Sequence, residues 1–260
     1  MRVWIAYRVE LIKALRTKRT YAGPLLVLLV VAGAVLRQPV LHDGISDYSY
    51  IVYATRLALH LLGFAVLLIY CAGLIAIERE SGSLRQVLTR PLLRHEYLLA
   101  KLLHAMTYVL LLTAVTGFAS WGIALGLGDV NGVIYGGDLI HTNEEMLRAY
   151  ILGAALSLAP LWAAAAYALL ISTIVRPPIA AALIALPGVV LIDMIKYRAG
   201  IAPLVFTTYL EAPLQVFADY ADGLSGRWWP MARDCLVYSA VAFGGFTAAA
   251  AAVLHRRDLA

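Results

Sequence analysis

Charged residues are scarce in this sequence. Asp, Glu, Lys and Arg make up 14% of the 260 residues, against about 25% in a typical soluble domain. The apolar residues, in contrast, make up 62%. A water-soluble globule of this size cannot bury so much apolar surface. The composition therefore excludes a soluble enzyme, a disordered protein and a disulfide scaffold, and it favours a polytopic membrane protein.

The sequence also has few cysteines and lacks a phosphate-binding loop. The two cysteines, Cys71 and Cys235, both lie in apolar runs, which is typical of buried free thiols. None of the 20 glycines is followed by lysine, so the chain lacks the Gly-Lys-Ser/Thr loop that holds nucleotide phosphates. The net charge of +5 predicts no nucleic-acid partner, because an excess of Lys and Arg in a membrane protein follows from the positive-inside rule.

Long uncharged stretches mark the predicted membrane spans. A spanning helix needs about 17–25 mostly apolar residues. Six stretches have this character: 20–36, 57–77, 102–128, 149–175, 177–195 (broken only by Asp193) and 235–254. They predict an all-α membrane protein with six transmembrane helices in a single domain over 1–260. The side that carries both termini has 14 Lys and Arg and the other side has 7, out of 21, so we expect both termini to be cytoplasmic.

Three segments outside the spans have distinct patterns. In 1–19, one helical stripe carries apolar groups and the basic residues lie off it, which predicts an amphipathic helix at the membrane surface with its basic groups toward lipid headgroups. The outer loop 196–233 is long and apolar, and we expect short helices bounded by Pro203 and Pro213. The segment 128–148 is rich in glycine and acidic residues, which predicts a solvated outer loop.

The predicted cytoplasmic loop 78–101 carries the most information. Gly82 allows a turn after the second span, and Ser83 can cap a short helix. That helix ends before Pro91, because proline disfavours a helical residue in front of it. Its apolar side consists of Leu84, Val87 and Leu88. A short helix with an apolar side and charged flanks favours a docking element, although the same pattern is compatible with an interfacial linker.

This loop resembles the first cytoplasmic loop of the membrane subunit of ABC-2 type transporters. The family's loop has the form Glu-x-Glu-x-Gly-Thr-Leu, then Leu-Ser/Thr-x-Pro-Ile/Val-x-Arg, then Gly/Ala-Lys. The matching residues are Glu78, Glu80, Gly82, Ser83, Leu84, Leu88, Thr89, Pro91, Arg94, Ala100 and Lys101. Ser83 stands where threonine is usual, and Leu92 stands where isoleucine or valine is usual.

The resemblance implies the permease subunit of an exporter whose ATP is hydrolysed on a separate ABC ATPase chain. It also implies a second permease copy, identical or related, and no cofactor on this chain, because ATP and magnesium would bind the ATPase. The implied ATPase-coupling interface consists of Glu78, Glu80, Gly82, Ser83, Leu84, Val87, Leu88, Pro91 and Arg94. The two glutamates would position the loop by pairing with basic groups on the ATPase or on the N-terminal helix.

No catalytic or metal site is predicted. The outer residues His141, Glu144 and Glu145 lack the spacing of metal ligands, and no paired midplane carboxylates suggest an intramembrane enzyme. Candidate residues along a transport path are the hydroxyl-bearing Tyr70, Thr107, Thr113, Thr116 and Tyr167. A second function class stays open: a membrane module of an ABC-type complex that assembles, matures or signals to an envelope protein without exporting a solute.

Overall fold

The protein is described from a computed structural model. The structure describes residues 2–38, 48–82, 93–128, 130–135, 138–224 and 228–256. Helices dominate these ranges, in agreement with the predicted all-α membrane class. A two-stranded antiparallel sheet, β1 (Val133–Tyr135) and β2 (Asp138–His141), is the exception.

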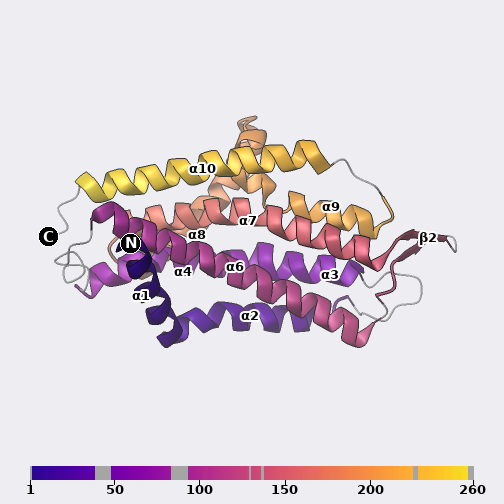
Figure 1. Cartoon of the computed structure of the whole chain (residues 1–260). Helices are drawn as coiled ribbons and strands as arrows, with labels where there is room; N and C mark the ends of the chain where they lie inside the picture. The colour runs from indigo at the N-terminus through magenta and orange to yellow at the C-terminus, as the bar shows by residue number, and fades with distance from the viewer. Residues whose placement is uncertain are drawn as a thin grey trace.

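Long helices form an elongated bundle (Figure 1). Described in chain order, the helices are α1 (Arg2–Arg16), α2 (Lys18–Ala34), α3 (Tyr48–Thr55), the π-helix η1 (Arg56–Leu62), α4 (Gly63–Glu80), α6 (Arg94–Leu127), α7 (Asn143–Ile174), α8 (Pro178–Arg198), the 3-10 helices η2 (Ala202–Leu204) and η3 (Phe206–Tyr209), α9 (Ala212–Ala221) and α10 (Trp228–Arg256).

Five of the described helical segments are long and apolar enough to cross a membrane. They are Tyr48–Glu80, which joins α3, η1 and α4, and the helices α6, α7, α8 and α10. The remaining predicted span corresponds to α2, which is shorter at 17 residues. The first three segments bury half or more of their most apolar window, whereas α8 and α10 leave most of theirs exposed. The core therefore lies between α4, α6 and α7.

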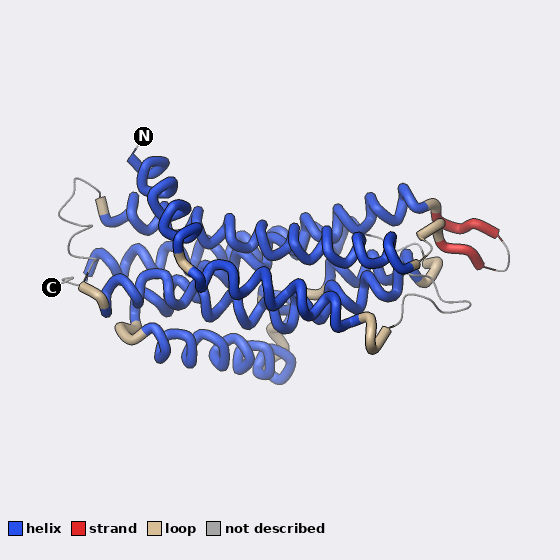
Figure 2. Tube along the Cα trace, turned by 90° about the horizontal axis from the view of Figure 1, so that it is seen from below, coloured by secondary structure: helices blue, strands red, loops and turns tan. Residues whose placement is uncertain are grey.

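The chain ends and the sheet lie at opposite ends of the bundle. The described termini are together at one end, and the β-hairpin projects from the other (Figures 1 and 2). We call these the termini end and the hairpin end. Helix α1 runs across the bundle, whereas α2 runs along it (Figure 1). A close approach at Gly23 brings α2 onto α6, because a Cβ atom there would lie 2.0 Å from the hydroxyl of Tyr108.

Two predicted boundaries need correction. The prediction of a loop over 128–148 is wrong in part, since strands β1 and β2 lie within it and α7 begins at Asn143. The helix begins there because Thr142 and Glu145 cap it: the Glu145 N–H donates to Thr142 Oγ1 at 3.3 Å, and the Thr142 N–H donates to Glu145 Oε2 at 2.9 Å. The second predicted span also extends back through Arg56, whose guanidinium donates to Gln215 of α9.

Candidate functional site

Helix α4 ends at the start of the predicted coupling loop. Its last residue is Glu80, and Gly82 follows with φ of +70°. A positive φ after a helix is the usual way to stop it, and glycine adopts this conformation without strain. The predicted turn at Gly82 therefore lies at the root of the loop. The predicted docking helix lies outside the described residues: this applies to Leu84, Val87 and Leu88 on its apolar side, to its predicted cap Ser83 and to Pro91, which was predicted to end it.

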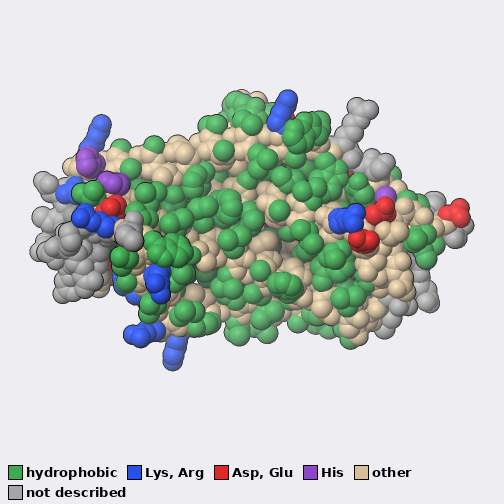
Figure 3. Space-filling model, in the orientation of Figure 1, with side chains coloured by type: hydrophobic (Ala, Val, Ile, Leu, Met, Phe, Trp, Pro, Cys, Tyr) green, Lys and Arg blue, Asp and Glu red, His purple; other side chains and the backbone are tan. Residues whose placement is uncertain are grey.

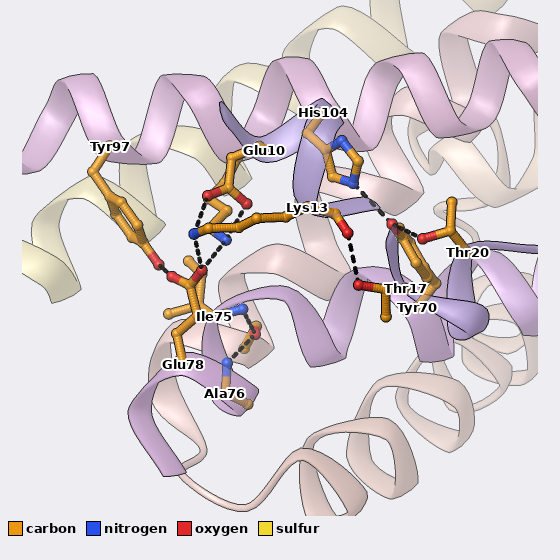
Figure 4. Close-up of polar contacts among 12 residues, drawn as sticks. Glu10, Lys13, Thr17, Thr20, Tyr70, Ile75, Ala76, Glu78, Tyr97 and His104 are labelled. Atoms are coloured by element: carbon orange, nitrogen blue, oxygen red, sulfur yellow. Dashed lines mark hydrogen bonds and ion pairs between the residues drawn. The ribbon is translucent and has the colours of Figure 1, made fainter. Parts of the chain in front are cut away.

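Four charged residues meet at this root. Lys101 of α6 contacts Glu10 of α1 at 2.5 Å and Glu78 of α4 at 2.8 Å. Lys13 of α1 contacts the same two carboxylates, Glu10 at 2.9 Å and Glu78 at 3.1 Å. Tyr97 of α6 donates to the second oxygen of Glu78 at 2.6 Å. We call Glu10, Lys13, Glu78 and Lys101 the charge cluster; Figure 4 shows the carboxylates of Glu10 and Glu78 on either side of Lys13.

The members of the charge cluster differ in their exposure to solvent. The Lys101 side chain is 2% exposed, and those of Glu10 and Glu78 are 11% and 12% exposed, whereas Lys13 is 47% exposed. A buried ion that loses its partner is strongly destabilising, because its desolvation is no longer compensated. Lys101 is therefore the residue on which both carboxylates depend. Exposed Lys13 adds a weaker, solvent-screened contact.

The pKa of Lys13 reflects its surroundings. Burial lowers this pKa, but the hydrogen bond to Glu10 and the attraction of Glu78 outweigh burial, so the pKa is raised above the usual 10.5. A raised pKa favours the charged form in the folded protein. Its contribution to stability is therefore fully present below pH 10.5 and is lost as the pH rises through the raised value.

Arginines on both sides of the loop bind the ends of two further helices. Arg79 Nη1 donates to the carbonyl of Thr173 in the last turn of α7 at 2.7 Å. Arg94 Nη1 donates to the carbonyls of Leu254 and His255 in the last turn of α10, at 2.9 Å and 3.1 Å. Cations are favourable at helix C-termini, where carbonyls lack helical partners. The residues that flank the loop on its two sides are therefore connected to α1, α6, α7 and α10.

A second polar group continues from the charge cluster into the bundle. His104, one turn beyond Lys101, lies 2.8 Å from the hydroxyl of Tyr70 through its Nε2 atom. Tyr70 also lies 3.4 Å from Thr20 Oγ1 and stacks on Tyr108 with ring centroids 3.9 Å apart. Figure 4 shows His104, Tyr70 and Thr20 in a row beside α4. Tyr70, a candidate for the transport path, thus participates in helix packing within one chain.

Each of the other candidate path residues has its own, different surroundings. Thr107 lies 2.7 Å from the hydroxyl of Tyr7 of α1. Thr116 is fully buried and donates to its own helix at Leu112 O. Thr113 has a buried hydroxyl without a partner in the described part of the chain. Tyr167 packs on Phe246 of α10. The role of these residues along a path stays a prediction.

Sequence reasoning missed most of the charge cluster. It singled out Glu78 and Glu80; Glu78 pairs with α1, whereas Glu80 is exposed at the end of α4. It assigned no contact role to Glu10, Lys13, Tyr97 or Lys101. A signal was available, because charged residues are costly near a membrane and are expected to find partners. Within the described ranges, no three His, Cys, Asp or Glu side chains come together as metal ligands.

A comparison with known families identifies the chain. A family model described as "ABC-2 family transporter protein" matches residues 6–188, which is more than half of the 260 residues. This chain belongs to the ABC-2 transporter family. It is therefore a multi-pass membrane protein and the permease component of an ABC-type transport system. The ABC-2 match includes the whole charge cluster and ends within α8. A search of curated proteins found no match.

Proposed function

We propose that this ABC-2 chain is the membrane subunit of an ATP-driven exporter with six spans, α2 being the first of them, and both termini in the cytoplasm. The termini end would then face the cytoplasm, where an ATPase can reach the loop 81–93. The chain has no Gly-Lys pair among its 20 glycines, so ATP would be hydrolysed on a separate ABC ATPase subunit. The observation that carries the proposal is the charge cluster at the root of this loop.

The charge cluster supports a mechanical role for the loop. A movement of the loop would pull on α4 through Glu78 and on α6 through Arg94. Lys101 binds both Glu78 and Glu10, so α1 would move with these two helices rather than separately. The contacts of Arg79 and Arg94 with the ends of α7 and α10 would extend the movement to the rest of the bundle. The loop would thereby tilt the helices as a unit and open a path alternately to the two sides.

Two copies of the permease would be required. ABC-type ATPases act in pairs in the proposed assembly, and a closed twofold dimer is the commonest arrangement of identical subunits. Helices α8 and α10 leave most of their apolar windows exposed, which provides surface for a second copy and for lipid. The transport path would lie between the copies, and Tyr70, Thr107, Thr113, Thr116 and Tyr167 remain the candidates for its lining.

The first experiment tests the ATPase partner. The chain is purified in mild detergent from native membranes, and the proteins that remain bound are identified and quantified by mass spectrometry. We expect a P-loop ATPase at about one copy per permease chain. In the variant Leu84→Asp/Leu88→Asp the ATPase should be lost, because two carboxylates replace the predicted apolar docking side.

A matched control separates docking from misfolding. The variant Leu139→Asp introduces a single Leu→Asp change on β2, where the leucine is 53% exposed at the hairpin end; it should retain the ATPase. Recovery of the permease without an ATPase, or equal retention in all three preparations, would contradict the proposed coupling loop. A stoichiometric envelope protein in place of the ATPase would favour the assembly module instead.

A further inference from the structure

The corner between α1 and α2 carries exposed cations that form no ion pair with the carboxylates of the described residues. Arg16, Lys18 and Arg19 are all exposed, and in the described part of the chain none of them forms an ion pair. Lys13 and Lys101, in contrast, are bound to Glu10 and Glu78. Figure 3 shows Lys and Arg side chains at the lower left, over the α1–α2 corner, next to hydrophobic surface. We call these three residues the basic corner.

An apolar groove runs along the surface between α2 and α6. Its volume is about 570 Å³, which is within the range of pockets that bind small molecules. Its walls include Leu25, Leu29 and Ala32 of α2 and Phe118 and Gly122 of α6. None of the lining residues has a polar side chain, and a Cβ atom added at Gly122 would meet nothing within 4 Å. The groove is therefore open and suited to a hydrocarbon chain.

Lys18 of the basic corner and the α2 wall of the groove lie on the same face of α2. Lys18, Leu25, Leu29 and Ala32 are spaced by 7, 4 and 3 residues, which places them on one side of a helix with 3.6 residues per turn. Leu25 is about 10 Å along the helix from Lys18 and Ala32 about 21 Å, at 1.5 Å per residue. One leaflet of the hydrocarbon core is about 15 Å thick. An acyl chain whose headgroup lies at the basic corner would therefore end inside the groove.

We propose that this surface binds an anionic phospholipid from the leaflet at the termini end, with its headgroup at the basic corner and an acyl chain in the α2–α6 groove. The charge of the corner selects an anionic headgroup, because its cations are exposed and form no ion pair within the described ranges. The groove adds apolar contacts with the acyl chain to the electrostatic attraction of the headgroup. A bound lipid would brace α2 against α6 along the groove, beyond the corner where α1 turns into α2.

A second copy of this chain is the competing occupant of the groove. A symmetric contact over this face of α2 would bring two basic corners toward each other, and like charges at an interface are unfavourable. A lipid phosphate, in contrast, neutralises the corner. The proposal concerns only α1, α2 and α6, so it does not depend on the ATPase or on export.

Native mass spectrometry of the full chain tests the lipid site. The protein is incubated in detergent with equal amounts of phosphatidylglycerol and phosphatidylcholine that carry the same acyl chains. We expect phosphatidylglycerol to predominate among the bound lipid. In the variant Arg16→Gln/Lys18→Gln/Arg19→Gln this preference should fall by at least about fivefold, since each basic residue near an anionic surface contributes about that factor. The control Arg37→Gln, at the other end of α2, should retain the preference.

A second pair of variants tests the groove. Gly122→Leu places a branched side chain in the groove, and the binding of both lipids should decrease. Gly126→Leu is the matched control, because Gly126 is also open at its Cβ position and does not line the groove; it should bind lipid like the parent chain. If Gly122→Leu and Gly126→Leu bind the same amount of lipid, the proposed acyl-chain site in the groove is wrong. It is also wrong if only the basic-corner variant loses bound lipid. A protein dimer that Gly122→Leu dissociates while bound lipid is unchanged would equally contradict it.

Discussion

The two ends of the bundle are held together by different chemistry. At the termini end, α1, α4 and α6 meet through the charge cluster. At the hairpin end, α3, α6, α7 and α9 meet through aromatic rings: Tyr150 lies 5.2 Å from Phe217 and 5.8 Å from Trp121, and Tyr48 lies 6.0 Å from Trp121, measured between ring centroids. We call Tyr48, Trp121, Tyr150 and Phe217 the aromatic cap.

This difference has a mechanical consequence. Ion pairs and charge-assisted hydrogen bonds fix distance and direction, and each buried member needs its partner. Edge-to-face ring contacts retain most of their energy over a range of separations. The charge cluster is therefore suited to transmit a displacement between helices, and the aromatic cap is suited to tolerate one. Three variants test this contrast, in order of decreasing expected effect.

Lys101→Met should have the largest effect. The change removes the buried cation from the largely buried carboxylates of Glu10 and Glu78, although half-exposed Lys13 still contacts both and Tyr97 still donates to Glu78. Breaking a buried pair in this way costs about 3–5 kcal/mol. Thermal unfolding in detergent, followed by circular dichroism, should show a large decrease in the midpoint. The triple variant Lys101→Met/Glu10→Gln/Glu78→Gln should recover part of the loss. An undiminished midpoint in the single variant would contradict a structural role for the charge cluster.

Tyr150→Phe should have an intermediate effect at the aromatic cap. The ring contacts remain, but the hydroxyl that lies 3.1 Å from Thr55 Oγ1 and 3.5 Å from Ser120 Oγ is removed. A buried hydrogen bond of this kind contributes about 1 kcal/mol. The unfolding midpoint should decrease slightly, and Tyr53→Phe on neighbouring α3 serves as the control for loss of a hydroxyl. A decrease as large as that of Lys101→Met would mean that the cap depends on its polar contacts.

Lys13→Gln should have the smallest effect. Lys13 is about half exposed, and exposed ion pairs contribute about 0.2–1 kcal/mol. Salt screens such pairs, so the unfolding midpoints of this variant and the parent chain should converge as sodium chloride is raised to about 1 M. The unfolding midpoint of Lys101→Met should remain below that of the parent chain at the same salt concentration, because the contacts of Lys101 are buried. Convergence of Lys101→Met as well would show that water reaches the whole cluster.

Local sequence features predicted the helices well. Uncharged stretches placed α4, α6, α7, α8 and α10, because the length and polarity of a span are properties of consecutive residues. The same approach did not predict the hairpin, since a strand of three or four residues has too few positions to show an alternating pattern. It also did not predict that the helix of the second span continues through Arg56, whose partner Gln215 is 159 residues away.

The sequence by itself determined the membrane class, the places of the long helices and the ABC-2 motif at 78–101, because each depends on the composition or spacing of neighbouring residues. Only the tertiary structure decided which charges meet. Glu10 and Lys101 are separated by 91 residues and Glu78 and Lys13 by 65, and nothing in either local pattern specifies the partner. Packing of α1 on α6, next to the end of α4, brings these residues together, and the cost of leaving a buried charge unpaired keeps them there.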